Sequence, residues 1–580
     1  MVDIKTIINI LYPSQLTQMK IADKVKIWKN KPFDEETINQ IIELEKNQNE
    51  LNERFHSDLD FGTGGIRGLM GIGSNRINKY TISKFTQGIA NYLNRNTKKK
   101  KKSVIVAYDN RKNSKIFAYE VAKVFSANNI NVLIFDNLRP TPLLSFSIRH
   151  FNADGGIMIT ASHNPPEYNG YKVYNRYGGQ IVSPDDKKIS SIIKNLNFNE
   201  IKWNNNKHKI RLIDNEFDEA YFDNVISKSV IEKEKRQNLK IVYSSLHGTG
   251  IKSIPPLLIK AGYLDINLVE NQCLVDENFS NTNSSNPEDK VAFNETLKLA
   301  NKINGDLMIT TDPDADRIGV GVKDFKGNWV LLSGNQLMVL LFSFLIEKKE
   351  FKNEDFFVAT TIVSSPLFKK IAKKNDIECK LCHTGFKWIA DIIEKEKNKK
   401  FLCGGEESFG FLYGSEVRDK DAVATGLLFC DMFSFLKSKG KTVINYLINI
   451  YKHYGFHYDK LHTITRKGAN GNIKIKNQIE FLRLNPPKEI AGINVSRIDD
   501  YKVGIIYFKN GKKEKLELPK SNLIIYHLQD NSRISVRPSG TEPKIKFYIN
   551  LYAKFNDDFD LNRESFRLGK KFKQIIKHFD

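Results

Sequence analysis

The feature that most constrains the fold is an alternation of strand-like and helix-like segments that occurs three times. Short apolar runs alternate with segments whose apolar residues recur at helical spacing. The strand-like runs lie at 103–108, 131–135 and 155–160, at 239–245, 266–270 and 306–311, and at 356–363, 377–381 and 400–405. Strands separated by helices are typical of a mainly parallel sheet with helices on its faces. The sequence therefore predicts three similar α/β units with mixed, mainly parallel sheets and little sequence identity among them.

The pattern changes at about residue 461. Strand-like runs then follow one another closely, at 502–508, 515–518, 522–528, 533–539 and 544–552. An Asn-Gly pair at 510–511 is typical of a hairpin turn, and a basic helical segment ends the chain. We expect a fourth, α+β domain with an antiparallel sheet. The expected domains are 1–210, which includes a helical N-terminal extension, 211–325, 326–460 and 461–580.

The net charge raises the question of a nucleic-acid partner. The 580 residues include 90 Lys+Arg and 67 Asp+Glu, for a formal net charge of +23. A basic protein can bind nucleic acid, but here the lysines are spread along the whole chain, and the one tight run, at 98–102, is expected to be a solvated loop. We therefore expect no nucleic-acid partner. A positive field also suits a small anionic substrate, which it can steer.

The chain also lacks the marks of a membrane or disulfide-rich protein. No apolar run reaches the ~18 residues that a membrane span needs. The N-terminal segment has no signal-peptide cleavage pattern, so we expect a cytoplasmic protein with no membrane partner. Five cysteines do not make a disulfide scaffold, and Cys379 and Cys382 form a lone CxxC, which is weak evidence for zinc. We expect buried, reduced thiols.

Each of the three α/β units ends in a polar motif. The motifs are TASHNP (160–165), DPDADR (312–317) and GEESFG (405–410), each directly after the last predicted parallel strand of its unit. In open parallel sheets, ligands bind at the carboxyl ends of the strands. We therefore expect the three motifs to converge on one cleft.

The first motif presents a serine with a histidine beside it. Ser162 follows a buried strand and precedes two prolines, which suits a hydroxyl that must be held rigidly as a nucleophile or phosphate carrier. The alternative is a serine that caps a helix. His163 could orient or protonate the hydroxyl, and Lys172 could supply a positive charge or an acid–base nitrogen.

The second motif predicts a metal site. Asp312, Asp314 and Asp316 follow a strand that we expect to be buried, and Pro313 stiffens the loop. Alternate buried carboxylates are costly unless a cation neutralises them, and Mg²⁺ prefers carboxylate and phosphate oxygens. The alternative is an acidic surface turn.

Three further motifs, together with GEESFG, indicate binding of phosphate and sugar. The glycine-rich turn FGTGGIRG (61–68) contains Arg67, and GEESFG offers Glu406 and Ser408 to grip vicinal hydroxyls. HTGFKW (383–388) contributes Lys387. RPSGTEPK (537–544) combines a guanidinium, hydroxyls and backbone N–H groups into a phosphate clamp formed by Arg537, Ser539, Gly540 and Thr541. A serine carrier, a divalent metal, a hydroxyl-binding loop and a phosphate clamp together suit phosphoryl transfer on a phosphosugar.

The motifs TASHNP, DPDADR, GEESFG and RPSGTEPK, in this order and spacing, resemble those of the α-D-phosphohexomutases, the phosphoglucomutase and phosphomannomutase enzymes. The resemblance spans nearly the whole chain, from FGTGGIRG to the C-terminal helix. The long helical N-terminal segment and the length are similar to the subgroup that includes phosphoglucomutase-2 and its bacterial relatives. The resemblance implies four domains around a central cleft, the fourth of them similar to the TATA-binding-protein fold.

The resemblance also implies roles for the motif residues. It makes Ser162 the phosphoserine, with His163 beside it. It implies that Mg²⁺ is held by a phosphoryl oxygen on Ser162 and by the three aspartates. The sugar loop would be Glu406 and Ser408. The remaining residues would line the cleft or bind phosphate: Arg67, Lys172, Arg317, Lys387, Arg537, Ser539, Gly540 and Thr541. The implied partner is a small phosphosugar, with glucose 1,6-bisphosphate as activator and intermediate, and the enzyme would be a monomer or dimer.

The expected reaction interconverts glucose 1-phosphate and glucose 6-phosphate through a phosphoserine enzyme. The general base is open among Lys172, Arg67 and His163, and Lys387 stands in HTGFKW where some members of the family have other residues, which leaves the second proton-transfer group open. Alternative substrates are mannose, pentose and glucosamine phosphates. Rival classes are a metal-dependent phosphatase or kinase, although no GxxxxGK[ST] pattern is present, and a basic binding protein without catalysis.

Overall fold

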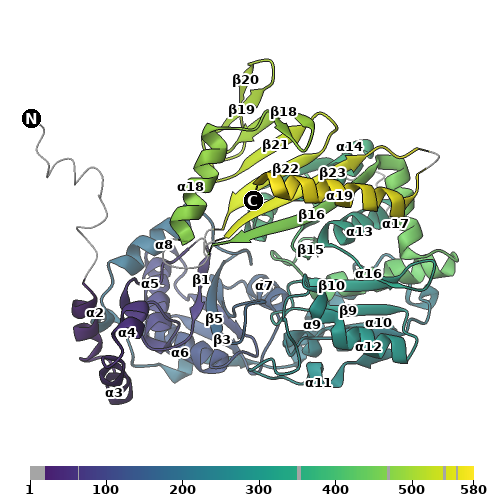
Figure 1. Cartoon of the computed structure of the whole chain (residues 1–580). Coiled ribbons are helices and arrows are strands. Elements are labelled where there is room, and N and C mark those ends of the chain that lie inside the picture. Colours follow the sequence, from purple (N-terminus) through teal and green to yellow (C-terminus); the bar gives the residue numbers. More distant parts are fainter. Residues whose placement is uncertain are drawn as a thin grey trace, which may run out of the picture.

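The computed structural model describes residues 20–62, 64–348, 355–466, 471–539, 544–556 and 559–579. These residues form four sheets with helices packed around them, and Figure 1 shows the first sheet at the left, the second at the lower right and the fourth at the top. The order of the sheets along the chain matches the four domains expected from the sequence. Strand β6 (Ile210–Ile213) pairs with the first sheet, and β16 of the fourth sheet begins at Phe456.

The strands of the first sheet are continuously apolar because both faces of the sheet are buried. Its strand order is β1 (Gly65–Leu69), β5 (Tyr168–Asn175), β4 (Gly155–Ile159), β2 (Ser103–Tyr108), β3 (Asn131–Phe135) and β6. Alternate residues of β2 enter different cores: Val104 and Val106 pack with α5 (Lys79–Asn96) and α6 (Ser114–Ala127), whereas Ile105 and Ala107 pack with α7 (Thr141–His150). Both faces are buried, so both sets of side chains are apolar.

The second and third sheets repeat the arrangement of the first. The second has the order β11 (Trp329–Leu331), β10 (Ile318–Lys323), β9 (Leu307–Thr311), β7 (Ile241–Ser244) and β8 (Ile266–Leu268). The third has the order β13 (Glu378–Cys382), β12 (Phe356–Thr361), β14 (Lys400–Glu406) and β15 (Gly410–Tyr413). In each unit three parallel strands are followed by an antiparallel one, which is β5, β10 or β15. The three predicted motifs lie at the turns between the last parallel strand and this antiparallel strand.

Most helices of the second and third units contribute to one shared core. They are α9 (Glu216–Ile226), α10 (Ile254–Ala261), α13 (Gly334–Lys348), α14 (Pro366–Lys374), α15 (Phe386–Lys395), α16 (Ala422–Ser438) and α17 (Val443–Tyr454). Helix α12 (Asn294–Lys302) packs instead in a separate cluster on the second sheet. A continuous buried apolar cluster runs from the α7 face of the first sheet through both units to the fourth. Because burial of apolar surface is the main stabilising term in folding, this shared core holds the ends of the three sheets in fixed positions.

The fourth sheet is antiparallel, as predicted. Its order is β16 (Phe456–Thr465), β23 (Lys544–Ala553), β22 (Arg533–Pro538), β21 (Ile524–Leu528), β18 (Ile493–Asp500), β19 (Ile505–Phe508) and β20 (Lys513–Lys515), with β17 (Glu489–Ile490) paired to β18. One face packs against α18 (Gly471–Leu484) and α19 (Leu561–Phe579), which lies across the sheet in Figure 1. The other face packs against Ile362 and Val363 of the third unit.

From residue 20 on, the N-terminal segment is helical, as predicted, and residues 1–19 lie outside the described residues. Helices α2 (Ile21–Trp28), α3 (Glu35–Leu44) and α4 (Gln48–Phe55) form a small core around Trp28, which stacks on Phe33 and meets the edge of Phe55. Tyr80 of α5 completes this core and attaches it to the first unit. Within the described ranges, no helix has the length and apolar character needed to cross a membrane. Among the described residues the five cysteines form no disulfide, and four of them are buried.

Candidate active site

Ser162 lies in the turn between β4 and β5 in a strained backbone conformation. Its φ is 52°, in the left-handed region that residues other than glycine rarely adopt. The Ser162 N–H donates to Thr160 Oγ1 over 2.8 Å, and Arg111 donates to the Ser162 carbonyl over 2.5 Å. The serine is 3% exposed. The surrounding hydrogen bonds therefore fix the direction in which its hydroxyl points.

Arg111 is the main support of this turn, and it was not predicted from the sequence. Its buried guanidinium also donates to the carbonyls of Asn164, Pro165 and Tyr168, over 2.6, 2.8 and 2.9 Å. Asp109 accepts a hydrogen bond from Arg111 Nε over 3.2 Å and one from Thr160 Oγ1 over 2.7 Å. One feature of the sequence could have identified Asp109 and Arg111: they are polar residues directly after a buried parallel strand, at the same sheet edge as Ser162.

The Ser162 hydroxyl contacts the aspartate loop of the second unit. Its Oγ donates to Asp312 Oδ2 over 2.8 Å and lies 3.3 Å from His163 Nδ1. The strand ends of the first and second units therefore converge, and Ser162, the candidate phosphate carrier, contacts the candidate metal-binding aspartates.

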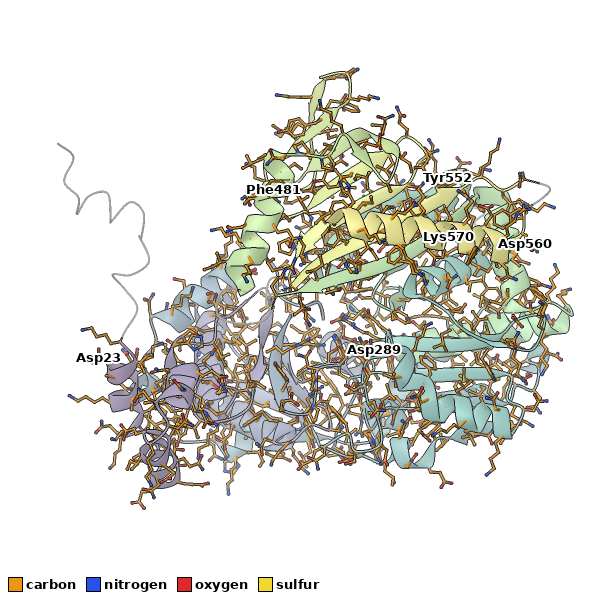
Figure 2. All side chains as sticks on the ribbon, viewed as in Figure 1. Asp23, Asp289, Phe481, Tyr552, Asp560 and Lys570 are labelled. Atoms are coloured by element: carbon orange, nitrogen blue, oxygen red, sulfur yellow. The ribbon has the colours of Figure 1, made fainter. Side chains whose placement is uncertain are left out.

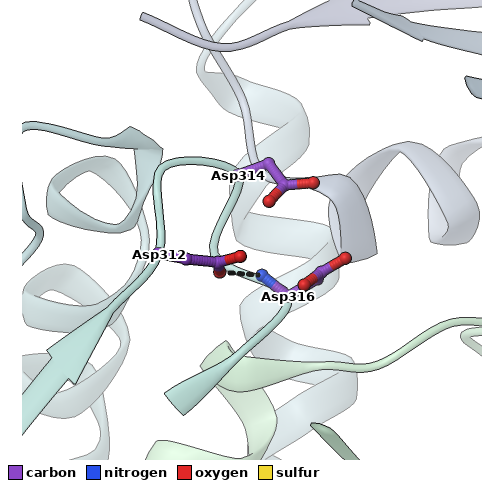
Figure 3. A group of neighbouring side chains, drawn as sticks. All are labelled: Asp312, Asp314 and Asp316. Carbon is purple, nitrogen blue, oxygen red and sulfur yellow. Dashed lines mark hydrogen bonds between the residues drawn. The ribbon is translucent and has the colours of Figure 1, made fainter. Parts of the chain in front are cut away.

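The three aspartates lie together and are fully buried. Asp312, Asp314 and Asp316 follow β9 and are at most 1% exposed, with one carboxylate oxygen of each within 4.8 Å of the others. Figure 3 shows the three side chains around the turn, with Asp312 accepting a hydrogen bond from the Asp316 N–H over 3.2 Å. The Arg317 N–H also donates to Asp312, over 2.9 Å. The loop thus folds around the carboxylate of its first aspartate.

Two lysines from other units balance part of this charge, and a threonine adds hydrogen bonds. Lys172 on β5 lies 2.6 Å from Asp314 and 3.1 Å from Asp316, and Lys420 of the third unit lies 3.1 Å from Asp316. Thr141, at the start of α7, donates to Asp314 Oδ2 over 2.8 Å and, through its N–H, to the Asp314 carbonyl over 2.9 Å. Lys420 and Thr141 were not predicted, because no local pattern links them to the loop.

The aspartate group fits a divalent cation. The Oδ1 atoms of Asp314 and Asp316 are buried and have no hydrogen-bond partner among the described residues. Buried carboxylate oxygens without a partner are costly, and a hard cation with oxygen ligands removes that cost. Burial and the charges of Asp316 and Asp314 raise the pKa of Asp312 well above its ordinary value. Burial alone would also raise the pKa of Asp316, but Lys172, Lys420 and Arg317 hold it below that value.

The charges around the serine also decide which group can accept a proton. Burial lowers the pKa of His163 well below its ordinary value, and the charges of Arg317 and Arg67 lower it further. Burial would lower the pKa of Lys172, but Asp314 and Asp316 raise it above its ordinary value. His163 is therefore neutral at pH 7, whereas Lys172 is charged. Arg67, on β1, donates to Asn164 Oδ1 over 2.7 Å.

The GEESFG motif forms the turn between β14 and β15. Glu406 is buried and accepts a hydrogen bond from the Gly385 N–H over 2.6 Å, and burial raises its pKa to about 7. Ser408 is half-buried on the same turn. The Ile318 N–H of β10 donates to the Phe409 carbonyl over 3.1 Å, which links this turn to the strand after the aspartates.

The remaining predicted residues lie on the third and fourth units. Lys387 is in the first turn of α15, and burial, together with the charge of Arg537, lowers its pKa to about 8. Arg537 is near the end of β22, and the Ser539 N–H donates to the Lys544 carbonyl over 2.7 Å. Gly540 and Thr541 lie outside the described residues. Two cavities, of about 420 and 340 Å³, lie under α5 and beside α10, away from the motif residues.

Comparison with protein families matches three consecutive parts of the chain. The matching descriptions are "Phosphoglucomutase/phosphomannomutase, alpha/beta/alpha domain" I for residues 58–200, II for 219–327 and III for 333–454. These ranges contain the first, second and third sheets. The exceptions are β6 of the first sheet and β11 of the second, which lie beyond the ends of the matched ranges.

Relatives named phosphoglucomutase match most of the chain. Proteins of that name from Staphylococcus aureus strains MRSA252 and MSSA476 are 39% identical over 515 residues, covering 88% of this chain and 92% of theirs. Among solved structures, a Thermus thermophilus protein assigned as a phosphomannomutase has a TM-score of 0.68 at 20% identity, over 90% of this chain and 99% of that one. The open form of parafusin, a Paramecium phosphoglucomutase, has a TM-score of 0.64 at 18% identity, over 90% and 96%. At these identities the structures support the fold alone.

Proposed function

The chain belongs to the phosphoglucomutase/phosphomannomutase family, and we propose that it interconverts glucose 1-phosphate and glucose 6-phosphate through a phosphoserine at Ser162. It is an isomerase that transfers a phosphoryl group within its substrate. The observation that carries the proposal is the 2.8 Å contact between the Ser162 hydroxyl and Asp312 in the buried aspartate group. A carrier hydroxyl next to a cation site is what phosphoryl transfer needs, since that reaction depends on positioning and charge neutralisation.

The first transfer moves the phosphoryl group from Ser162 to the sugar. The bond between phosphorus and Ser162 Oγ breaks, and a bond to the 6-hydroxyl oxygen of glucose 1-phosphate forms. The proton of that hydroxyl leaves and a proton is returned to Ser162. The product, glucose 1,6-bisphosphate, reorients in the site. The bond between its 1-oxygen and phosphorus then breaks, a bond from that phosphorus to Ser162 Oγ forms, and the serine proton passes to the 1-oxygen. Glucose 6-phosphate is then released.

The residues supply charge, proton transfer and binding in this cycle. The carboxylates of Asp312, Asp314 and Asp316 would hold Mg²⁺, which neutralises charge on a phosphoryl group. Lys172 is held between Asp314 and Asp316 as a cation, so it is better suited to charge stabilisation than to proton abstraction. Neutral His163, 3.3 Å from Ser162 Oγ, is the strongest candidate among Lys172, Arg67 and His163 to move a proton at the serine.

The other site residues are proposed to bind the sugar and its second phosphate. Glu406 accepts hydrogen bonds from the sugar hydroxyls, and Ser408 can accept or donate them. The phosphate that is not being transferred is bound by a second group of residues: Arg317, Lys387, Arg537, Ser539, Gly540 and Thr541. The domain limits at 210, 325 and 460, a cytoplasmic location and a monomeric or dimeric state remain predictions from the sequence.

A coupled assay tests the proposed function. Purified protein is mixed with Mg²⁺, a trace of glucose 1,6-bisphosphate and either glucose 1-phosphate or mannose 1-phosphate. Fast turnover of glucose 1-phosphate with slow turnover of mannose 1-phosphate is expected. Comparable rates would make the protein a dual-specificity enzyme. No turnover of either by folded protein with phosphorylated Ser162 would overturn the hexose proposal and favour pentose or amino-sugar phosphates.

A further inference from the structure

A segment of the second unit lies over the Ser162 turn of the first. It comprises residues 274–289 and follows the short helix α11 (Glu270–Cys273). The Asn110 side chain donates to the Asp276 carbonyl over 3.0 Å, and the Arg111 guanidinium lies 5.1 Å from the centre of the Phe279 ring. Ser285 Oγ donates to the His163 carbonyl over 3.0 Å. Asp289, the last residue of the segment, is labelled in Figure 2 near the border between the first and second units. The segment therefore contacts Arg111, the main support of the serine turn, and the turn itself at His163.

Hydrogen bonds from buried residues of the second unit hold this segment in place. His247 is fully buried, with its Nδ1 2.8 Å from the Leu274 carbonyl, and its Nε2 accepts the Asn281 N–H over 3.1 Å. The Gln272 side chain donates to the Asn281 carbonyl over 2.7 Å. Ser284 Oγ donates to Asp289 over 2.6 Å. Hydrogen bonds at both ends and in the middle fix the backbone, so the side chains near its end have defined positions.

One of these side chains, Glu288, pairs with the arginine that follows the aspartates. Its Oε1 lies 2.5 Å from Arg317 Nη1, and the two side chains are 23% and 17% exposed. Arg317 Nε is buried, lies 3.9 Å from Asp316 Oδ1 and has no hydrogen-bond partner in the described part of the chain. The guanidinium is therefore held by one hydrogen-bonded partner on one side and faces the aspartate group on the other.

Arg317 lies beside the aspartate group through both its backbone and its side chain. Its N–H donates to Asp312 over 2.9 Å, and its Nε lies 3.9 Å from Asp316 Oδ1. An arginine side chain has many rotamers, and holding it in one of them in advance reduces the cost of binding a phosphate. Without its partner, the Arg317 guanidinium is free to turn toward the neighbouring carboxylates.

We propose that Glu288 is a positioning residue that holds the Arg317 guanidinium in the orientation needed to bind a phosphoryl group. This inference rests on the proposed function. Glu288 itself does not contact the sugar phosphate and acts through Arg317, so its removal has an effect only when Arg317 is present. That dependence separates it from a glutamate that merely stabilises the fold.

A double-mutant cycle tests the proposal. kcat and KM for glucose 1-phosphate are measured for the wild type, Glu288→Gln, Arg317→Ala and the double variant. Glu288→Gln is expected to lower kcat/KM about 10–100-fold, as loss of an orienting partner does at metal sites. In the Arg317→Ala background the same change is expected to cost less than about twofold, because nothing is left to position. Equal losses in both backgrounds would overturn the proposal.

Two controls keep the result interpretable. Glu295→Gln removes a glutamate of the same unit that pairs with Lys298 over 2.7 Å on α12, and it is expected to leave kcat/KM unchanged. Melting temperatures are measured for every variant, and Glu288→Asp replaces Glu288→Gln in the cycle if the latter does not fold. If the wild type turned over neither glucose 1-phosphate nor mannose 1-phosphate, the proposed function would be contradicted. The cycle is then measured on the binding of inorganic phosphate by calorimetry, where additive losses would again overturn the role of Glu288.

Discussion

The hydroxyl of Ser162 donates a 2.8 Å hydrogen bond to Asp312, which lies 150 residues further along the chain. The two residues belong to different α/β units, each at the turn after the last parallel strand of its sheet. The contact therefore depends on the packing of two domains as well as on the two turns. Since Arg111 and Thr160 fix the serine turn and the buried β9 fixes the aspartate loop, the two groups meet without a local connection between them.

The first prediction concerns the carrier. Ser162→Ala should reduce turnover of glucose 1-phosphate to background, because no hydroxyl remains to accept the phosphoryl group. Intact-mass measurement after incubation with glucose 1,6-bisphosphate should show one added phosphoryl group on the wild type and none on the variant. Ser191→Ala, on the exposed side of α8 (Asp185–Lys194), serves as the control and should behave as the wild type. Near-normal activity of Ser162→Ala would end the carrier role.

The second prediction concerns the support of the metal site. Thr141 holds Asp314 through both its hydroxyl and its N–H, and Thr141→Val removes only the hydroxyl bond. Loss of such an outer partner typically weakens metal binding about 10–100-fold. Binding of Mn²⁺, followed by electron paramagnetic resonance, should show this loss independently of activity.

The control for this variant is Thr86→Val. Thr86 is a buried threonine of the same unit, whose hydroxyl donates to the Ile82 carbonyl and lies 3.1 Å from the Tyr171 hydroxyl. It should lose stability without losing affinity for Mn²⁺. If Thr141→Val bound Mn²⁺ as tightly as the wild type, Thr141 would have no part in the metal site.

The third prediction concerns the turn that carries Ser162. Arg111→Ala leaves four carbonyl groups without their donor and the buried Asp109 without its cation. Breaking one side of a buried ion pair typically costs about 3–5 kcal/mol of the free energy of unfolding. Urea unfolding should show a loss of this size, and kcat should fall because the Ser162 backbone relaxes from its strained conformation. Arg111→Lys, which keeps the charge but not the planar fork, should recover part of the stability and less of kcat. Equal recovery of both would mean that the charge alone supports the turn.

The parallel strands and the motifs after them could be predicted from the sequence, whereas some strands and site residues could not, for physical reasons. Parallel strands buried on both faces are apolar throughout, so their positions and the motifs after them could be recognised. The antiparallel strands β5, β10 and β15 were missed, because β5 (YNGYKVYN) is rich in polar residues, β10 contains glycines and β15 has only four residues. Lys420 and Glu288 were missed for another reason. Each is an ordinary charged residue in its own segment, and only the packing of the units brings it to Asp316 or Arg317.

The fourth prediction concerns Glu406 and pH. Its pKa is raised from 4.5 to about 7, mainly because it is buried. Between these values the folded protein keeps a proton that the unfolded chain has released, so this carboxyl makes the free energy of unfolding fall as pH rises from about 4.5 to 7. One pKa unit corresponds to about 1.4 kcal/mol, and the shift therefore amounts to on the order of 3 kcal/mol.

Glu406→Gln should remove this contribution. Its stability relative to the wild type should rise by that amount between about pH 4.5 and 7 and stay constant above about pH 8, measured by urea unfolding at each pH. The exposed Glu234→Gln should show no such change, since it carries no burial cost. Glu406→Gln should also lose activity above about pH 7, where the wild-type carboxyl is an anion toward the sugar hydroxyls and the amide is not. A stability difference that does not vary with pH would mean that Glu406 is ionised in the folded protein throughout this range, and its burial would then have to be balanced by Lys420.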